Sequence, residues 1–339
     1  MPTKTAIFLT GATGYLGGAT LQLLMQNADL SITVLVRDKE KAAKLENLGL
    51  KTVIGSLDDA ALMETEAVKA DAIMQSASFE HVDGVSALLR GAKNRFIQTG
   101  KRPIFIQTSG AAAFVKLDAM GEYSSERVIS DADSDLFDFK NTTPHNIVND
   151  IVIAADGEGY VRTYIVYPAN IYGVLKGPLV DAGVSHAFSM LSVITLAIEF
   201  SIQRGQGAMV GKGLNRWPAA HIDDAAGLYK LILERALADE APHGAQGTFV
   251  IENCEYTFVD AAKCYTAVLH AHGKSAGADP DTCTADELAR IPRLFFLGTD
   301  VRLRGDRARK LGWRPVHGVE TFYTSVKEDT EAVLAGKDD

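Results

Sequence analysis

Cysteine is scarce in this sequence: 339 residues contain three thiols, at Cys254, Cys264 and Cys283. Their number is odd, and no two of them are spaced as Cys-x-x-Cys. This excludes the disulfide framework that stabilises small secreted domains, and it is typical of a protein whose thiols stay reduced inside the cell. We therefore predict an intracellular, cytoplasmic protein.

The sequence also lacks an excess of positive charge and a long apolar run. Lysine and arginine number 34 against 43 aspartate and glutamate residues, which gives a formal net charge of 34 − 43 = −9. A protein that neutralises nucleic-acid phosphates needs a basic surface, so we expect no nucleic-acid partner. The longest apolar stretch, 187–200, is short for a bilayer span and contains Glu199, so we expect no membrane partner.

Metal-ligand spacing is missing as well. His81, His145, His186 and His221 are scattered along the chain, without the close pairing that zinc sites show. The sequence therefore predicts no metal site.

What the sequence has is a regular alternation of strand and helix patterns in its first half. Short apolar runs rich in β-branched residues alternate there with longer amphipathic stretches. The runs lie at 5–9, 31–36, 51–55, 71–77, 103–109 and 162–168. Continuously apolar strands have both sheet faces covered, and alternation with helices gives right-handed β–α–β units. We therefore predict an α/β fold with a Rossmann-type, doubly wound parallel sheet.

The regular alternation of strand and helix patterns ends after Tyr172. A helix is predicted over 181–204 and a further strand over 248–253. We predict an α/β domain over 1–172 and a smaller substrate lobe over 173–339, interleaved with the last elements of the sheet.

Three glycines follow the first strand directly. Gly11, Gly14 and Gly17 stand in the sequence TGATGYLG, at the start of a helix pattern. At this spacing one glycine permits a tight turn, one lets the backbone approach a pyrophosphate, and one allows the helix to pack on the strand. The helix N-terminus then offers N–H groups and a favourable dipole to phosphate. The turn predicts that the first domain binds NAD(P), and the site includes three further residues of the turn: Thr13, Tyr15 and Leu16.

The residues after the next strands indicate which dinucleotide binds. Arg37 follows the second strand, and its guanidinium suits the 2′-phosphate of NADP(H). The alternative is that Arg37 is solvated and that Asp38 binds ribose. Leu57 and Asp58 follow the third strand and are candidates to frame the adenine, although Asp58 also suits the cap of the next helix. Ala77, at the end of the fourth strand, completes the predicted site, which favours NADP(H) over NAD(H).

Five segments together resemble those of a known family. They are TGATGYLG (10–17), IFIQTSGAAAF (104–114), YPANIYG (167–173), HIDDAAGLY (221–229) and RARKLGWRP (307–315). The chain resembles the extended or atypical short-chain dehydrogenase/reductases, closest to the NAD-dependent epimerase/dehydratase-like and NmrA-like proteins common in fungi. The resemblance covers nearly the whole chain, and it implies a nicotinamide dinucleotide and a small-molecule substrate. A homodimer is a possibility that the sequence leaves open.

The resemblance also implies roles for particular positions. Ser109 matches the family's catalytic serine, which orients the substrate oxygen. The segment expected to run beneath the nicotinamide comprises Pro168, Ala169, Asn170 and Ile171. The expected substrate contacts are Ala111, Trp217 and His221, and a hydrogen bond within the lobe is the other interpretation of His221.

The active-site pair departs from the family pattern. The family carries Tyr-x-x-x-Lys on one helix face, where the lysine holds the nicotinamide ribose and lowers the tyrosine pKa. The matching positions here are His145 and Asn149. Asparagine can bind a ribose hydroxyl but has no charge, whereas histidine titrates near neutrality and can donate a proton unaided. The alternatives are that His145 is only a polar first-turn residue, and that Tyr172 or the pair Tyr123 and Arg127 replaces the tyrosine.

These features leave three functions open. We expect an enzyme, an NADP(H)-dependent oxidoreductase that acts on a carbonyl or hydroxyl group of a small metabolite. One alternative is a non-redox isomerase, dehydratase or cyclase that uses general acid and base groups in the same pocket. The other is a non-catalytic, NmrA-like nucleotide-binding regulator, because the fold alone does not fix the function.

Overall fold

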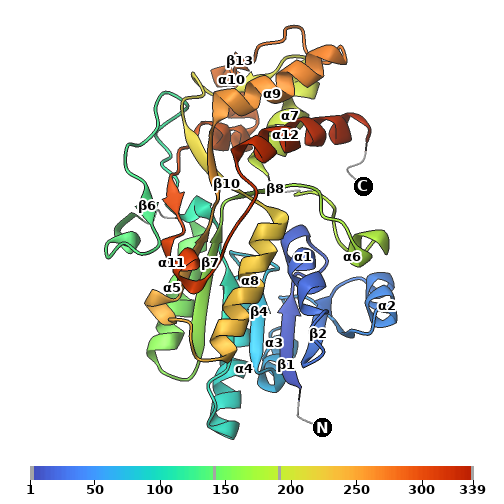
Figure 1. Ribbon diagram of the computed structural model, residues 1–339, viewed down its shortest axis with the longest axis vertical. Helices are drawn as coiled ribbons and strands as arrows, with labels where there is room; N and C mark the ends of the chain where they lie inside the picture. Colours follow the sequence, from blue (N-terminus) through green and yellow to red (C-terminus); the bar gives the residue numbers. More distant parts are fainter. Residues whose placement is uncertain (1–3, 140–142, 190–191, 337–339) are drawn as a thin grey trace.

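A computed structural model describes residues 4–139, 143–189 and 192–336. Its centre is a seven-stranded sheet ordered β11-β7-β5-β4-β1-β2-β3 (Figure 1). The strands are β1 (Thr5–Thr10), β2 (Leu30–Val36), β3 (Lys51–Ile54), β4 (Ala72–Gln75), β5 (Ile104–Thr108), β7 (Arg162–Pro168) and β11 (Thr248–Ile251). Every neighbouring pair is parallel, and the order runs outward in both directions from β1. The predicted Rossmann-type, doubly wound sheet is confirmed.

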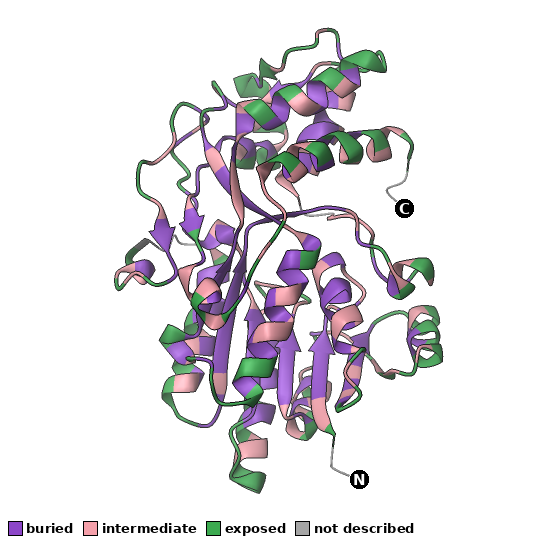
Figure 2. Ribbon diagram, viewed as in Figure 1, coloured by how far each residue is buried: buried purple, intermediate pink, exposed green. Residues whose placement is uncertain are grey.

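Helices cover both faces of this sheet, and each strand sends alternate side chains to the two faces. Ile7 and Leu9 of β1 pack into one core, whereas Phe8 between them packs into the other. One face carries α1 (Tyr15–Leu24), α2 (Lys39–Asn47), α8 (Ile222–Leu237) and α11 (Asp306–Leu311). The opposite face carries α3 (Ala60–Lys69), α4 (Val82–Thr99) and α5 (Pro144–Gly157). Figure 2 shows the central strands buried and the exposed residues on the outer helices and on the loops.

A smaller lobe lies over the carboxyl ends of the sheet strands (Figure 1). Its three-stranded sheet has the order β12-β10-β8 and comprises β8 (Asn170–Tyr172), β10 (Arg216–His221) and β12 (Cys254–Thr257). Its helices are α7 (Val193–Arg204), α9 (Phe258–Ala271), α10 (Ala285–Arg290) and α12 (Val319–Leu334). One further helix is short, α6 (Pro178–Asp181). Two pairs of short strands are parallel: β6 (Ile129–Ser130) with β14 (Leu303–Arg304), and β9 (Ala208–Met209) with β13 (Asp281–Thr282). Short 3-10 helices lie at Ala111–Phe114, Leu136–Phe139, Gly244–Gln246 and Pro292–Gly298.

The chain passes between the sheet domain and the lobe several times. It leaves the sheet after β7, forms β8 and α7 in the lobe, returns as α8 and β11, and ends in the lobe as α12. These crossings lie at the carboxyl edge of the large sheet, where open α/β sheets bind their ligands.

The predicted helix over 181–204 is wrong in its first half. α7 begins only at Val193, where the hydroxyl oxygen of Ser192 accepts the N–H of Ile194 at 3.1 Å and caps the helix. Gly183 turns the chain between α6 and α7 with a φ of 64°, which interrupts the apolar pattern that suggested one helix. Among the described residues, no helix is both long enough and apolar enough to cross a membrane.

Candidate cofactor and active site

The glycine turn between β1 and α1 has no room for side chains at two of its three glycines. Gly11 adopts a φ of 81°, and a Cβ there would overlap the backbone of Ser76 at the end of β4. A Cβ at Gly17 would overlap the carbonyl oxygen of Gly11, because α1 packs directly on the turn. A Cβ at Gly14 would come near that same oxygen alone among the described residues, at 3.3 Å. The first and third glycines are therefore needed for the fold, whereas the second borders open space.

The first turn of α1 offers unsatisfied polar groups at this space. Gly14 precedes the helix without a side-chain hydrogen bond, and no acidic residue lies in the first turn. Thr13 and Leu16 lie here, half-buried. The Tyr15 hydroxyl donates to the carbonyl of Gly173 at 2.6 Å, so it joins the turn to the segment after β8. Free N–H groups at a positive helix end fit the pyrophosphate of a dinucleotide.

Arg37 and Asp38 differ in what they contact at the end of β2. Oδ1 of Asp38 accepts the N–H groups of Lys41 at 3.1 Å and Glu40 at 2.7 Å, and these bonds lower the pKa of its carboxyl. Asp38 therefore caps α2. Arg37 is exposed at the same edge. The Arg37 guanidinium is therefore more available to a ligand than the Asp38 carboxylate.

Asp58 lies beyond β3, near Arg37. Its carboxylate accepts hydrogen bonds from Nε2 of His81 at 3.0 Å and from the Ser56 hydroxyl at 3.1 Å. These bonds, with a smaller contribution from the Arg37 charge, lower the pKa of Asp58. Nδ1 of His81 accepts the N–H of Gly84 at the start of α4, which leaves the ring proton on Nε2. Asp58 therefore sits in a hydrogen-bonded group at the predicted adenine end.

The residues around Asp58 complete this edge. The interpretation of Asp58 as the cap of α3 is wrong, because Asp59 caps that helix by accepting the N–H of Leu62 at 3.0 Å. Leu57 is buried against the sheet. The backbone of Ala77 lies against the first glycine of the turn.

Ser109, His145 and Asn149 converge at the carboxyl end of β5. Ser109 follows β5 directly and is buried. Asn149, on α5, donates from Nδ2 to the Ser109 hydroxyl oxygen at 2.9 Å, and it also approaches Oδ1 of Asn146 at 3.4 Å. Because the serine oxygen accepts this bond, its own O–H remains able to donate to a substrate oxygen.

His145 lies in the first turn of α5 and stacks on Phe79. The ring centroids are 4.1 Å apart and the planes differ by 8°. Nε2 faces the backbone next to Ser109, since a Cβ added at Gly110 would lie 3.4 Å from it. Nδ1 is buried 3.9 Å from Oε1 of Glu80 and has no hydrogen-bond partner among the described residues.

The protonation of His145 differs from what its sequence position suggests. Burial lowers its pKa to about 4, so the ring is neutral near pH 7 instead of titrating there. A neutral imidazole can donate or accept a hydrogen bond, but it has no imidazolium proton to deliver.

Tyr172 and Tyr123, the two alternatives to the family tyrosine, do not join the group formed by Ser109, His145 and Asn149. The Tyr172 hydroxyl donates to the backbone carbonyls of Gly318 at 3.1 Å and His317 at 3.3 Å, ahead of α12, and burial raises its pKa well above the ordinary value. Tyr123 is exposed in a segment without helix, and Arg127 pairs with Asp135 at 2.9 Å. Tyr123 and Arg127 therefore do not share a helix face.

The remaining predicted residues divide between the sheet edge and the lobe. Pro168 ends β7, Ala169 follows it, and Asn170 and Ile171 open β8. Oδ1 of Asn170 accepts the Ser192 hydroxyl at 3.1 Å. Ala111 is buried two residues after Ser109. Trp217 fills the lobe interior and donates from Nε1 to the Thr299 carbonyl at 2.8 Å.

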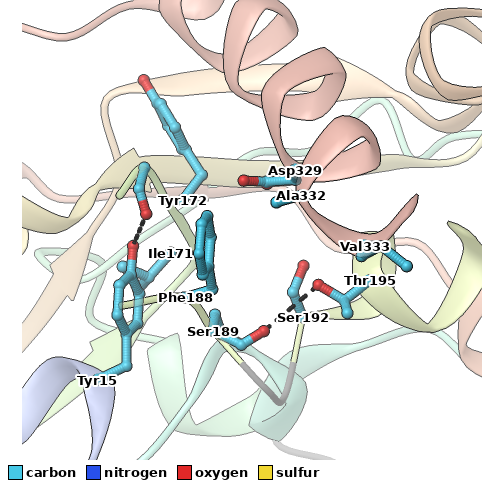
Figure 3. Close-up of a pocket in the computed structure, with 11 residues that line it drawn as sticks. Tyr15, Ile171, Tyr172, Phe188, Ser189, Ser192, Thr195, Asp329, Ala332 and Val333 are labelled. Atoms are coloured by element: carbon cyan, nitrogen blue, oxygen red, sulfur yellow. Dashed lines mark hydrogen bonds between the residues drawn. The ribbon is translucent and has the colours of Figure 1, made fainter. Parts of the chain in front are cut away.

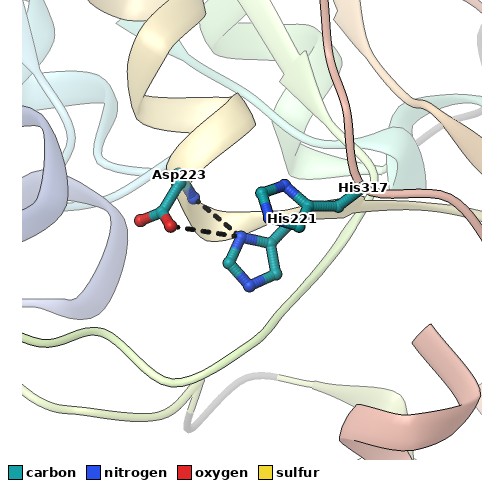
Figure 4. A group of neighbouring side chains, drawn as sticks. All are labelled: His221, Asp223 and His317. Carbon is teal, nitrogen blue, oxygen red and sulfur yellow. Dashed lines mark hydrogen bonds and ion pairs between the residues drawn. The ribbon is translucent and has the colours of Figure 1, made fainter. Parts of the chain in front are cut away.

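His221 belongs to a cluster where β10 meets α8 (Figure 4). Nδ1 accepts the N–H of Asp223 at 3.3 Å, and the ring stacks on His317 with centroids 3.9 Å apart. Each of His221, Asp223 and His317 offers one atom that could bind a metal ion, and these three atoms lie within 4.8 Å of one another. Within the part of the chain that the structure describes, this is the one such group. Nδ1 of His317 is already bonded to Asp224 at 3.0 Å. The contacts present are hydrogen bonds and stacking between the two histidines.

A small pocket lies between the cofactor turn and the lobe (Figure 3). It is lined by Tyr15, Ile171, Tyr172, Gly173, Phe188, Ser189, Ser192, Thr195, Asp329, Ala332 and Val333. Asp329 and Ser192 line this pocket, and neither is among the site residues predicted from the sequence. An amphipathic pattern shows which helix face is polar, but it does not show which polar residue borders a pocket.

Sequence comparison with known proteins matches this chain to a family and to two fungal relatives. The model of the NAD-dependent epimerase/dehydratase family matches residues 7–249, from β1 to β11. The oxidase ucsJ of an Acremonium species is 30% identical over 335 residues, which cover 91% of this chain and 92% of that protein. An uncharacterised protein of Saccharomyces cerevisiae is 23% identical over 91% of this chain and 94% of its own length.

Solved structures share the fold. A dTDP-glucose 4,6-dehydratase from Bacillus anthracis, in complex with NAD, has a TM-score of 0.67 at 14% identity and covers 99% of this chain and 97% of its own. A UDP-glucose 4-epimerase from Thermotoga maritima, with UDP-glucose, has a TM-score of 0.64 at 18% identity, over 98% and 100% of the two chains. At these identities the likeness shows the shared architecture alone.

Proposed function

The chain belongs to the NAD-dependent epimerase/dehydratase family, and on this premise we propose that it is an oxidoreductase that uses NADP(H) to act on a small metabolite. The reacting group is a carbonyl or a hydroxyl. The main support is one hydrogen bond: the Ser109 hydroxyl oxygen accepts the N–H of the Asn149 side-chain amide. The O–H of Ser109 can therefore donate to a ligand at the edge of the sheet where the glycine turn lies. That arrangement suits the orientation of a substrate oxygen.

The cofactor would be held by three parts of the chain. The N-terminus of α1, with Gly14 at its cap, would bind the pyrophosphate. The 168–171 segment would hold the nicotinamide half, and the Asp58 group would hold the adenine. When bound, the nicotinamide supplies or accepts the hydride.

The chain's own groups then handle the substrate oxygen. Ser109 donates a hydrogen bond to it, and the neutral His145 ring presents Nε2 beside the same position. The accompanying proton is exchanged with water, because His145 carries no spare proton and the Tyr172 hydroxyl is engaged by backbone carbonyls.

NADP(H) is preferred over NAD(H) in this proposal. The Asp38 carboxylate is occupied as the cap of α2, which weakens the case for a ribose-binding acid. Arg37 is exposed beside it, and a guanidinium pairs well with a 2′-phosphate.

The test has two stages. The purified protein is titrated with NADPH and NADH while nicotinamide fluorescence is followed, and it is then surveyed with carbonyl compounds for NADPH oxidation. We expect tighter binding of NADPH than of NADH, and oxidation with at least one carbonyl class. Absence of nucleotide binding would overturn the proposal, and binding without turnover across a broad survey would favour a nucleotide-binding regulator.

One observation favours a second candidate, a non-redox isomerase, dehydratase or cyclase. The neutral His145 ring presents Nε2 beside Gly110, next to Ser109, and a neutral imidazole nitrogen there can accept a proton from a bound substrate. Product formation that does not depend on added nucleotide would support this candidate.

A further inference from the structure

One nitrogen of the His145 ring is buried without a hydrogen bond. Nδ1 has no partner among the described residues, and it lies 3.9 Å from Oε1 of Glu80. The His145 side chain is 9% exposed, and Nδ1 itself is buried, so solvent cannot satisfy it. A buried polar atom without a partner is costly. The group that satisfies Nδ1 must therefore come from the chain itself.

The Glu80 carboxylate is able to be that group. Its side chain is 47% exposed and forms no hydrogen bond with the described residues, so it can rotate. Its backbone is held in place, because the Glu80 N–H donates to the Ser78 hydroxyl at 3.2 Å and the Glu80 carbonyl accepts the N–H of Val82 at 3.0 Å. A side-chain movement of about 1 Å would bring Oε1 within hydrogen-bond distance of Nδ1.

The orientation of the His145 ring is fixed by its other neighbours. The ring stacks on Phe79, the residue before Glu80, with centroids 4.1 Å apart and planes that differ by 8°. On the opposite side of the ring, Nε2 would lie 3.4 Å from a Cβ added at Gly110. The ring therefore presents Nδ1 to Glu80 and Nε2 to the backbone next to Ser109.

This arrangement favours one of the two neutral forms of the ring. Burial lowers the pKa of His145 to about 4, so at pH 7 one ring nitrogen carries a proton and the other a lone pair. A carboxylate only accepts hydrogen bonds, so Glu80 can bond Nδ1 only when Nδ1 carries the proton. In the other form, two lone pairs would face each other. A carboxylate at Nδ1 thus leaves Nε2 as the acceptor.

We propose that Glu80 is a positioning residue of the active site: its carboxylate accepts the Nδ1–H of His145 and so keeps Nε2 unprotonated beside Ser109. The role at the site rests on the proposed function. Nε2 would accept a hydrogen bond from the water with which the substrate oxygen exchanges its proton, while the Ser109 hydroxyl donates to that oxygen. Glu80 acts through His145 and does not touch the substrate.

Nuclear magnetic resonance of the full chain, labelled with 15N-histidine, tests the pairing at pH 7 without any ligand. The protonated and unprotonated nitrogens of a neutral imidazole have well-separated 15N shifts, and His145→Gln identifies the His145 signals. We expect the Nδ1–H form to exceed the Nε2–H form roughly tenfold or more, the effect of one hydrogen bond to a charged group.

Two substitutions at Glu80 separate the hydrogen bond from the side chain's bulk. Glu80→Met removes the acceptor and should lower the ratio of the two forms about tenfold. Glu80→Gln keeps an oxygen acceptor and should retain the preference for Nδ1–H. Glu126→Met, which removes another exposed carboxylate, is the control and should leave the His145 signals unchanged. A predominant Nε2–H form in the unaltered chain, or an unchanged ratio in Glu80→Met, would overturn the inference.

Kinetics then test the role of the pairing at the site. With a carbonyl compound found in the NADPH survey, we expect kcat to fall about tenfold in Glu80→Met, to stay within about threefold in Glu80→Gln, and NADPH affinity to be kept in both. An unchanged kcat in Glu80→Met would overturn the positioning role. If the Nδ1–H form dominates but no carbonyl compound oxidises NADPH, the oxidoreductase proposal falls and the pairing of Glu80 with His145 stands.

Discussion

The side-chain amide of Asn149 donates a hydrogen bond to the hydroxyl oxygen of Ser109, with 2.9 Å between Nδ2 and Oγ. Asn149 is fully buried, and we predict from the sequence that it stands where the family carries a lysine. A lysine there would place an ammonium in the interior, whereas the amide fixes the serine without adding charge. In the function proposed above, the substrate oxygen would therefore be oriented by neutral hydrogen bonds.

Replacement of Asn149 by leucine tests this orientation. The variant keeps the side-chain size and removes the donor to Ser109. We expect kcat for NADPH-dependent reduction to fall about 10²-fold, as for loss of one positioned donor. The free energy of unfolding should fall by about 1 kcal/mol, measured by urea denaturation. Ile147→Ala, at a residue 55% exposed on the same helix, should change neither quantity. An unchanged kcat in Asn149→Leu would show that the bond does not orient the serine.

Alanine at two glycines of the turn should separate binding from folding. In Gly14→Ala the new Cβ lies 3.3 Å from a single oxygen, so we expect the melting temperature to be kept and NADPH binding to weaken about tenfold or more. In Gly17→Ala the Cβ overlaps the Gly11 carbonyl, and we expect stability to fall by about 2 kcal/mol or more. Melting curves and nicotinamide fluorescence measure the two effects. Normal NADPH affinity in folded Gly14→Ala would contradict the phosphate-binding role.

Burial of neutral His145 should make stability depend on pH. Its folded pKa, about 4, lies below the ordinary value of 6.5, so the unfolded chain binds more protons between these two values. Stability therefore rises with pH across this window, by up to about 1.4 kcal/mol per pH unit for one proton, and is lost as pH falls. Urea unfolding from pH 4.5 to 7.5 measures it.

His145→Gln provides the control for this pH dependence. Burial also lowers the pKa values of His186 and His221, and their contributions remain in both proteins. Any part of the pH dependence of the unfolding free energy that disappears in the variant is therefore the contribution of His145. Identical pH profiles for the two proteins would mean that His145 is not held neutral.

The fold could be predicted from sequence because its signals are local. The apolar run at 5–9 and the three glycines after it specify a strand, a turn and a helix within about twenty residues. The predicted helix over 181–204 failed where Gly183 and Ser192 break it, and those breaks depend on short-range turn chemistry hidden by an apolar pattern.

The electrostatics of the site could not be predicted because they depend on contacts distant in sequence. The ring of His145 loses its charge through burial, and it stacks on Phe79, which is 66 positions away along the chain (145 − 79 = 66). His221 meets His317 only because α8 and the loop before α12 come together. No spacing rule connects such residues, so their pairing appears only in the folded chain.

Arg37 should determine the choice between the two dinucleotides. In Arg37→Gln the guanidinium that would meet the 2′-phosphate is lost, and we expect NADPH affinity to fall roughly tenfold to a hundredfold. NADH affinity should change little, because NADH lacks that phosphate. Lys39→Gln removes an exposed cation of α2 and should leave the NADPH to NADH ratio intact. Parallel loss of both affinities in Arg37→Gln would mean that Arg37 does not read the 2′-phosphate.

Tyr172→Phe decides whether that hydroxyl takes part in chemistry. The hydroxyl donates to the carbonyls of Gly318 and His317, and its raised pKa makes it a poor proton donor. We therefore expect kcat to stay within about threefold, whereas loss of a general acid costs 10²-fold or more. The free energy of unfolding should fall by about 1 kcal/mol, because α12 loses its tie to β8. A large fall in kcat with unchanged stability would instead make Tyr172 the replacement for the missing tyrosine.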